Sequence, residues 1–217
     1  MLVIDLSVPL DERTAVYQDP RGYSDPLTRF APWIEIGETR GGFVSPYRVT
    51  LLQLGAHTGT HLDVGAHFHL GGQTVTDVPT QSLAGWAVVI DLSELDDAEI
   101  GAERFAPYRA RASADGATPL IITADDACLS PSAAKEIVSW RRPLMVLVGG
   151  LDGDDLSYPL LGAILGAGVA LATGIDPARA RLVQDGDLLI VAPLPLTDLE
   201  GAPCRVLAIR GPRPATP

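Results

Sequence analysis

The sequence predicts a mixed α/β fold in which strands outnumber helices. Short apolar runs rich in β-branched residues recur along the chain, and most are about five to eight residues long, a length typical of strands. Glycine, proline and aspartate border these runs, as they do where strands end in turns. Only a few stretches carry signals for the start of a helix. Strands interspersed with few helices indicate a mixed sheet with helices packed against it.

Eight of these runs are predicted to form strands. In chain order they cover residues 2–8, 47–54, 86–93, 119–124, 143–150, 168–175, 187–196 and 204–210. Their lengths and their borders suit strands better than helices.

Three stretches are predicted to be helical. The clearest follows Ser130, which suits the N-cap position, with Pro131 at the first helical position and a run of alanines after it. Two more helices are predicted over residues 96–106 and 158–166. The segment 11–42 is rich in proline, glycine and charge but also holds aromatic residues, which indicates a long loop that packs over another part of the molecule.

The length of 217 residues suits one domain with a single sizeable core. We expect this domain to cover residues 1–210 and residues 211–217 to form a flexible tail, since that end is rich in proline and follows the last apolar run. No internal repeat or low-complexity linker marks a second domain.

The charge excludes some classes of partner. A net charge of -11 argues against binding to nucleic acid or to an anionic membrane surface, because long-range repulsion opposes both. No apolar run approaches the roughly 18 residues needed to span a bilayer, and the N-terminus is typical of a first strand and not of a signal peptide. Cys128 and Cys204 lack the CxxC spacing, so two buried free thiols in a cytoplasmic protein are expected. A small molecule or another protein is the expected partner.

All four histidines of the chain lie within residues 57–69, and Asp63 lies among them. In an extended chain His57 and His61 would be about 13 Å apart, which is too far for both to bind one ion. Gly59 between them permits a bend that brings them together. Two imidazoles and the Asp63 carboxylate would then form a ligand set that suits Zn²⁺ or Mn²⁺ and leaves coordination positions open for catalysis.

A simpler interpretation treats these histidines as loop residues that are satisfied by backbone hydrogen bonds, with Asp63 as a turn former. The concentration of four histidines around one carboxylate favours the metal site. His67 suits proton transfer, although a role as a ligand or as a support for the ligands stays open. His69 fits a supporting or loop residue as well as a participant.

The segment HTGTHLDVGAH resembles the HxGTHxDxPxH pattern of the cyclase family, which includes bacterial kynurenine formamidase (arylformamidase). The matching residues are His57, Gly59, Thr60, His61, Asp63 and His67. Other similar stretches are IDLSVPL, VYQDP, GGQTVTDVP, LAGWAVVIDLS, LGAGVAL and GDLLIVAPLPL, which span nearly the whole chain.

The resemblance implies a swivelling β/β/α domain of the cyclase and kynurenine formamidase type that assembles as a homodimer or homotetramer. It implies that His57, His61 and Asp63 bind the metal and that His67 is the catalytic acid and base. Thr60 and His69 would contact these residues and hold them in position without binding the metal.

The sequence departs from the family pattern in two ways, and the second bears on the number of metal ions. Gly65 replaces the proline of the pattern and loosens that loop. Leu161 and Thr173 stand where members with two metals supply a histidine and a glutamate, and neither can replace those ligands. We therefore expect one ion, unless an acid of the segment LDGDDL (Asp152, Asp154 or Asp155) reaches the site. Those three acids are more typical of a solvated loop.

The resulting hypothesis is a metal-dependent hydrolase that acts on an amide or related acyl bond of a small aromatic or cyclic substrate. Metal-activated water would attack the carbonyl carbon while His67 moves the proton. Tyr17, Trp33 and Phe68 are the candidate residues for an aromatic binding pocket. One alternative is an enzyme that uses the ion as a Lewis acid to cyclise, dehydrate or isomerise a natural-product intermediate, with His67 as base. Another is a binding protein of the same fold without turnover.

Overall fold

The computed structural model of the chain describes residues 1–14, 29–34, 39–40, 43–44, 49–95, 99–124, 127–149 and 157–211. Side chains between residues 29 and 49 and at residues 157–159 are not among the described features. Tyr17, the three acids of the segment LDGDDL and the tail from residue 212 onward lie outside the described residues.

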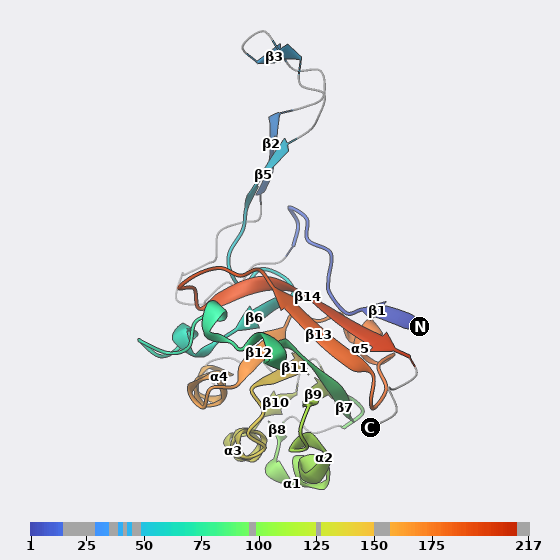
Figure 1. Ribbon diagram of the computed structural model, residues 1–217. Coiled ribbons are helices and arrows are strands. Elements are labelled where there is room, and N and C mark those ends of the chain that lie inside the picture. The colour runs from blue at the N-terminus through green and yellow to red at the C-terminus, as the bar shows by residue number, and fades with distance from the viewer. Residues whose placement is uncertain are drawn as a thin grey trace.

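The main body is an eight-stranded sheet that closes on itself (Figure 1). Its strand order is β1-β14-β13-β7-β9-β11-β12-β6, and β6 also pairs with β14. The strands are β1 (Leu2–Asp5), β6 (His61–Asp63), β7 (Ala84–Leu92), β9 (Ala117–Thr123), β11 (Leu144–Val148), β12 (Ala170–Thr173), β13 (Leu188–Pro193) and β14 (Gly201–Arg210). The long strand β14 contacts β6 with its first residues and β1 with its last, so β14 is the strand that closes the sheet.

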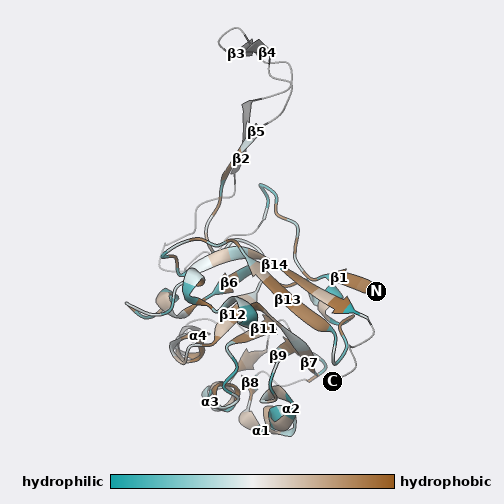
Figure 2. Ribbon diagram, viewed as in Figure 1, coloured by the Kyte–Doolittle hydropathy of each residue, from teal (hydrophilic) through white to brown (hydrophobic). Residues whose placement is uncertain are grey.

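The centre of the sheet is parallel and buried on both faces. Strands β7, β9, β11 and β12 run parallel, and all five residues of β11 are buried. Alternate residues of a strand belong to opposite cores: Leu120 and Ile122 contribute to the core inside the closed sheet, whereas Ile121 packs under the helices. Uninterrupted apolar runs therefore suit the four parallel strands, because neither of their faces meets water. Figure 2 shows hydrophobic colouring also along β13 and β14, which pair antiparallel.

Helices cover the outer face of β9 and β11 (Figure 1). They are α1 (Ala102–Phe105), α2 (Arg109–Ala112), α3 (Pro131–Ser139) and α4 (Ser157–Gly166), while α5 (Pro177–Ala180) lies near β1. Short 3-10 helices are η1 (Gly65–His67), η2 (Val75–Asp77), η3 (Thr80–Leu83) and η4 (Ala106–Tyr108). The largest side chains under the helices are Phe105 and Trp140, both buried with ring centroids 6.1 Å apart. Among the described residues, no helix combines the length and the apolar character needed to cross a bilayer.

The predicted start of α3 is confirmed. The Ser130 hydroxyl accepts a hydrogen bond from the Ala133 amide at 3.1 Å, and Pro131 occupies the first turn. The helix predicted over 158–166 is α4. The helix predicted over 96–106 is wrong in its first part, because β8 (Glu99–Ile100) pairs there with β10 (Cys128–Leu129) and α1 begins only at Ala102. That pairing joins residues distant in sequence, so the local pattern does not reveal it.

Each of the eight predicted runs contains a strand, and the expected mixed α/β architecture with few helices is confirmed. Three-residue β6 was not predicted. The segment 11–42 is not all loop, because it contains β2 (Arg29–Ile34) and β3 (Thr39–Arg40), which pair with β5 (Val49–Gln53) and β4 (Phe43–Val44). Both cysteines are free, as expected, but each is only half-buried.

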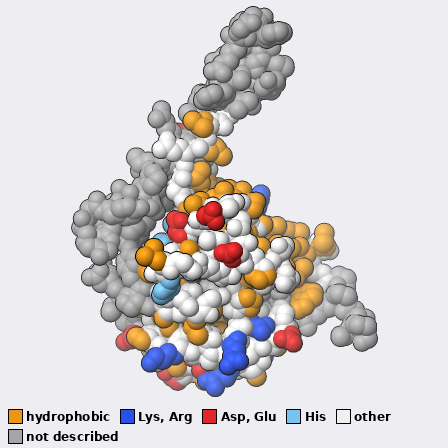
Figure 3. All heavy atoms as spheres, turned by 60° about the vertical axis from the view of Figure 1, so that its left-hand side comes forward, with side chains coloured by type: hydrophobic (Ala, Val, Ile, Leu, Met, Phe, Trp, Pro, Cys, Tyr) orange, Lys and Arg blue, Asp and Glu red, His pale blue; other side chains and the backbone are white. Residues whose placement is uncertain are grey.

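Strands β2 and β5 form a two-stranded ribbon, here called the arm, that extends away from the main body (Figure 1). Leu51 and Leu52 of the arm are 52% and 59% exposed. Because they are consecutive in a strand, they point to opposite faces of the ribbon. Figure 3 shows hydrophobic side chains on the described part of the arm and on the neighbouring surface of the body.

Candidate metal centre

The histidine segment bends at Gly59, as predicted. The backbone of Gly59 adopts φ +63°, a left-handed conformation that side chains disfavour, and a Cβ atom there would collide with the side chain of Leu10. Strand β6 begins directly after the bend, at His61. The ring centroids of His57 and His61 lie 5.3 Å apart, far closer than in an extended chain.

The bend gathers the three candidate ligands. One ligand atom each of His57, His61 and Asp63 lies within 4.8 Å of the other two. Asp63 Oδ1 is 2.6 Å from His57 Nδ1, and Asp63 Oδ2 is 3.4 Å from His61 Nε2. His61 and Asp63 face the same side because they are two apart in β6, whereas Leu62 between them is buried in the core.

The His61 ring is held from behind. Its Nδ1 atom lies 2.7 Å from the Gly59 carbonyl oxygen. A carbonyl oxygen only accepts, so Nδ1 carries the hydrogen and Nε2 keeps its lone pair. The Thr173 hydroxyl lies 3.1 Å from that Nε2. Thr173, the residue that the family resemblance aligns with a glutamate ligand, is thus at the site. Leu161 instead packs with the hydrophobic residues under the helices.

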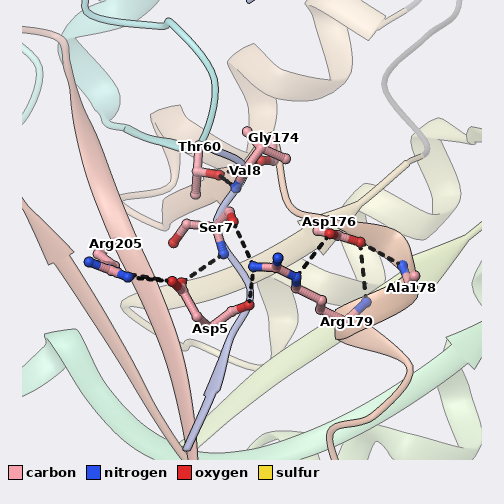
Figure 4. A network of polar contacts seen from close by, with 9 residues as sticks. All are labelled: Asp5, Ser7, Val8, Thr60, Gly174, Asp176, Ala178, Arg179 and Arg205. Carbon is pink, nitrogen blue, oxygen red and sulfur yellow. Dashed lines mark hydrogen bonds and ion pairs between the residues drawn. The ribbon is translucent and has the colours of Figure 1, made fainter. Parts of the chain in front are cut away.

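Thr60 fastens the bend to two other segments. Its hydroxyl accepts a hydrogen bond from the Val8 amide at 2.9 Å and donates one to the Gly174 carbonyl at 2.5 Å (Figure 4). The same network continues through Asp5, whose carboxylate accepts from Arg205 at 2.6 Å. Thr60 therefore positions the segment between the N-terminal strand and the end of β12.

The electrostatics of the three residues suit a cation. Burial alone would raise the pKa of Asp63, but the adjacent imidazoles of His57 and His61 bring it well below its usual range. Burial would lower the pKa of His57, but Asp63 and Glu200 outweigh this effect and raise it. The buried Asp63 charge therefore faces two imidazoles, and a divalent ion would balance that charge.

The donor set also matches a metal ion in chemistry. Two imidazoles and one carboxylate are ligands of Zn²⁺ and Mn²⁺, and a set of three leaves positions for water and substrate. His57 Nε2 is buried without a hydrogen-bond partner among the described residues. Such an unpaired polar atom is unusual in a structural role and is more typical of a functional site. The residues present fit a divalent ion.

His67 ends η1 beside this group. Its ring stacks on that of His57 with centroids 4.2 Å apart, and it meets the Phe68 ring edge-on at 4.6 Å. The ring of His67 is exposed on one side, but partial desolvation by its neighbours and the adjacent His57 lower its pKa. A bound cation would lower it further. His67 is therefore neutral near pH 7 and can accept a proton.

The other predicted site residues lie at different distances from the ligands. His69 is exposed, and its Nε2 lies 2.9 Å from the Gly162 carbonyl oxygen, so it fastens the loop to α4. Phe68 is half-buried and packs against the same helix turn. Trp33 lies in β2 of the arm, but its side chain is outside the described part, as is all of Tyr17.

Two residues at the site were missed in the sequence. Glu200 Oε1 lies 3.4 Å from His57 Nε2. Gly201 begins β14 opposite Asp63, and a Cβ atom on it would lie 2.5 Å from Cε1 of His57. The pairing of β14 with β6 brings both residues to the histidines. The only local signal is a Glu-Gly pair just before the last predicted strand.

Comparisons with known proteins agree with this fold and site. The family described as "Putative cyclase" matches residues 4–144, more than half of the chain. The kynurenine formamidase of Bacillus cytotoxicus is 29% identical over 217 residues, which cover 94% of this chain and 95% of the relative. The kynurenine formamidase of Bacillus cereus is 26% identical over 222 residues, with the same coverage.

Solved structures show the same architecture. Isatin hydrolase A from Labrenzia aggregata superposes with a TM-score of 0.75 at 24% identity and covers 95% of this chain and 93% of its own. A structure described as a potential metal-dependent hydrolase with cyclase activity has a TM-score of 0.70 at 23% identity, covering 97% and 99%. At these identities the likeness shows the fold, so the predicted cyclase-type fold is confirmed. The chain belongs to the cyclase family.

Proposed function

We propose that this chain is a metal-dependent hydrolase that cleaves an amide bond in a small aromatic substrate. The observation that carries the proposal is the convergence of His57, His61 and Asp63 within 4.8 Å beside the stacked ring of His67. Kynurenine formamidases, the curated relatives, are aligned over nearly the whole chain, which supports amide chemistry on an aromatic molecule.

We propose that one divalent ion, Zn²⁺ or Mn²⁺, is held by His57, His61 and Asp63. When bound, such an ion supplies a water of lowered pKa and a Lewis acid for the substrate carbonyl. Thr173 is the argument for a single ion. Its hydroxyl lies against His61, at the position where a second ion would need a carboxylate ligand. Thr60 and the Gly59 carbonyl hold the ligands in place, since they fix the bend and the His61 ring.

We assign proton transfer to His67. With its pKa lowered by partial desolvation and by His57, the ring is neutral and can take the proton of the attacking water. It then returns that proton to the leaving nitrogen, which cannot depart as an anion. The Phe68 ring against His67 provides an aromatic surface at the same place, and we propose Tyr17 and Trp33 as further candidates for the substrate pocket.

The protein is proposed to be a cytoplasmic homodimer or homotetramer with one domain over residues 1–210. The exposed hydrophobic surface of the arm is an argument for the oligomer. A two-stranded ribbon is marginally stable by itself in water, and the arm exposes leucine on both faces. Contact with a second copy would bury these side chains.

Thr173 also favours a second candidate function, in which the ion acts only as a Lewis acid for cyclisation, dehydration or isomerisation with His67 as base. Its hydroxyl changes the ligand shell that the family resemblance implies, and a changed shell can serve a different reaction.

The test combines elemental analysis with product analysis. We expect the gently purified protein to contain one equivalent of zinc or manganese and to release the free amine from N-formylkynurenine or from simple anilides. Removal of the ion by a chelator should stop the reaction, and its return should restore it. Bound metal without any hydrolysis product would favour the second candidate. Absence of both would support a binding protein without turnover.

A further inference from the structure

The two nitrogens of His57 have different surroundings. Nδ1 faces the ligand group, 2.6 Å from Asp63 Oδ1. Nε2 points away from that group and is buried, yet it has no hydrogen-bond partner among the described residues. A buried ring nitrogen without a partner is costly, so a group that completes this contact is expected nearby.

Glu200 is placed to complete it. Its Oε1 atom lies 3.4 Å from His57 Nε2, about 0.5 Å beyond an ordinary hydrogen bond. The backbone of Glu200 is anchored, since its carbonyl accepts a hydrogen bond from the Val64 amide at 3.1 Å. Its side chain is 40% exposed and can rotate to close the remaining gap.

The approach also depends on Gly201. Strand β14 passes so close to the His57 ring that a Cβ atom on Gly201 would lie 3.0 Å from Nδ1 and closer still to Cε1. The missing side chain lets the imidazole lie against β14, with the Glu200 carboxylate at its far nitrogen. Glu200 and the ring thus form a pair that depends on the pairing of β14 with β6.

We propose that Glu200 is a positioning residue of the metal centre, whose carboxylate accepts the hydrogen of His57 Nε2 and thereby leaves the Nδ1 lone pair for the ion. The inference rests on the proposed metal-dependent function. Histidine ligands of metals commonly donate their second N–H to a carboxylate or carbonyl, which fixes the ring orientation and strengthens the ligand.

The two histidine ligands then have matching supports. His61 donates from Nδ1 to the Gly59 carbonyl and offers Nε2 to the ion. His57 donates from Nε2 to Glu200 and offers Nδ1. The support of His57 is a charged carboxylate, whereas that of His61 is a neutral carbonyl. Glu200 should therefore make His57 the stronger electron donor to the ion.

The test compares Glu200→Ala and Glu200→Gln with Asp198→Asn. Asp198 is exposed and lies two residues before Glu200, so Asp198→Asn removes a negative charge nearby while the Glu200 carboxylate stays in place. Zinc affinity is measured by competition with a chromophoric chelator, and the absorption spectrum of the Co²⁺-loaded protein reports the ligand set. We expect Glu200→Ala to bind zinc about 10- to 100-fold more weakly with an unchanged Co²⁺ spectrum. Glu200→Gln should lose less, because its amide oxygen can still accept the hydrogen.

Three results would overturn the role of Glu200. They are an unchanged affinity in Glu200→Ala, an equal loss in Asp198→Asn, and an altered Co²⁺ spectrum, which would make Glu200 a direct ligand. Thermal unfolding of the metal-free variants shows that each is folded. If the unsubstituted protein binds no metal, the proposed function itself fails, a result distinct from a normal affinity that Glu200 does not influence.

Discussion

Two buried aspartates, Asp63 and Asp187, differ in the kind of charge that faces them. They are 5% and 4% exposed. The Asp187 carboxylate accepts two hydrogen bonds from the Arg210 guanidinium, at 2.8 and 2.9 Å, and one from the Gln184 amide at 2.9 Å. The Asp63 carboxylate is paired with the imidazoles of His57 and His61.

Both carboxyl groups have a lowered pKa despite burial, which by itself raises the pKa of each. A lowered pKa therefore does not distinguish a functional acid from a structural one. The distinction lies in the partner: the guanidinium of Arg210 is charged at every relevant pH, whereas an imidazole loses its proton near neutrality. Asp187 therefore has a permanent cation as its partner, whereas Asp63 faces two potential metal ligands.

The largest expected effect concerns the ligands around Asp63. His61→Ala should reduce the metal content to near zero and abolish turnover, because two donors cannot hold the ion in place of three. Asp187→Asn should keep a full complement of metal, since its partner is an arginine. Elemental analysis of both variants after identical purification checks this difference. Full metal content in His61→Ala would contradict the ligand assignment.

The next effect separates binding from turnover at the same site. His67→Ala should retain the metal and lower kcat by about 10²- to 10⁴-fold, the usual contribution of an acid and base group. Metal content and steady-state rates are measured on the same preparation. An equal loss of metal in His67→Ala and His61→Ala would show that His67 is a ligand and not the proton carrier.

Asp187→Asn should act on stability alone. Loss of charged hydrogen bonds with Arg210 is expected to lower the free energy of unfolding by about 1 to 3 kcal/mol, measured by urea denaturation of the metal-free protein. Metal affinity is the control, and it should stay within twofold of the unsubstituted value.

The same variant gives a pH dependence with a definite sign. Because the pKa of Asp187 is lowered from 3.8 in the folded protein, its contribution is present above about pH 4 and is lost as the pH falls through the lowered value. The difference in unfolding free energy between the two proteins should therefore be constant from pH 7 to 5 and shrink below pH 4. A difference that grows on acidification would contradict the role of the ion pair.

The smallest expected effect is a change in the reactivity of the Cys204 thiol, which depends on the charge of Asp63. Burial, with a further contribution from Asp63, raises the pKa of the Cys204 thiol to about 12. The thiol should thus stay protonated and react slowly with iodoacetamide at pH 8 in the folded protein. Asp63→Asn should speed this reaction severalfold, whereas Asp187→Asn should leave it unchanged. Mass spectrometry of the labelled peptides measures both rates.

Several features were predictable because their physical causes are local. The apolar runs identify the strands of the sheet, since burial on both faces selects continuous hydrophobic sequence. Ser130 and Pro131 mark the start of α3 through a cap that spans three residues. The bend at Gly59 and the grouping of the three candidate ligands fall within seven residues, so spacing and glycine alone indicate them.

Other features depended on pairing between distant segments. Strand β6 is only three residues long and contains two polar candidate ligands, so it has no apolar run to reveal it. Its place between β12 and β14 brings Thr173, Glu200 and Gly201 to the histidines. Strand β8 likewise forms by pairing with the distant strand β10, where the local sequence predicts a helix.

By itself, the sequence determined which side chains can bind a cation, because these residues are neighbours along the chain. Only the tertiary structure decided which groups surround them, because closure of the sheet through β14 joins segments that no local pattern connects. Strands pair through backbone hydrogen bonds, so the sequence of one strand does not identify the strand with which it pairs.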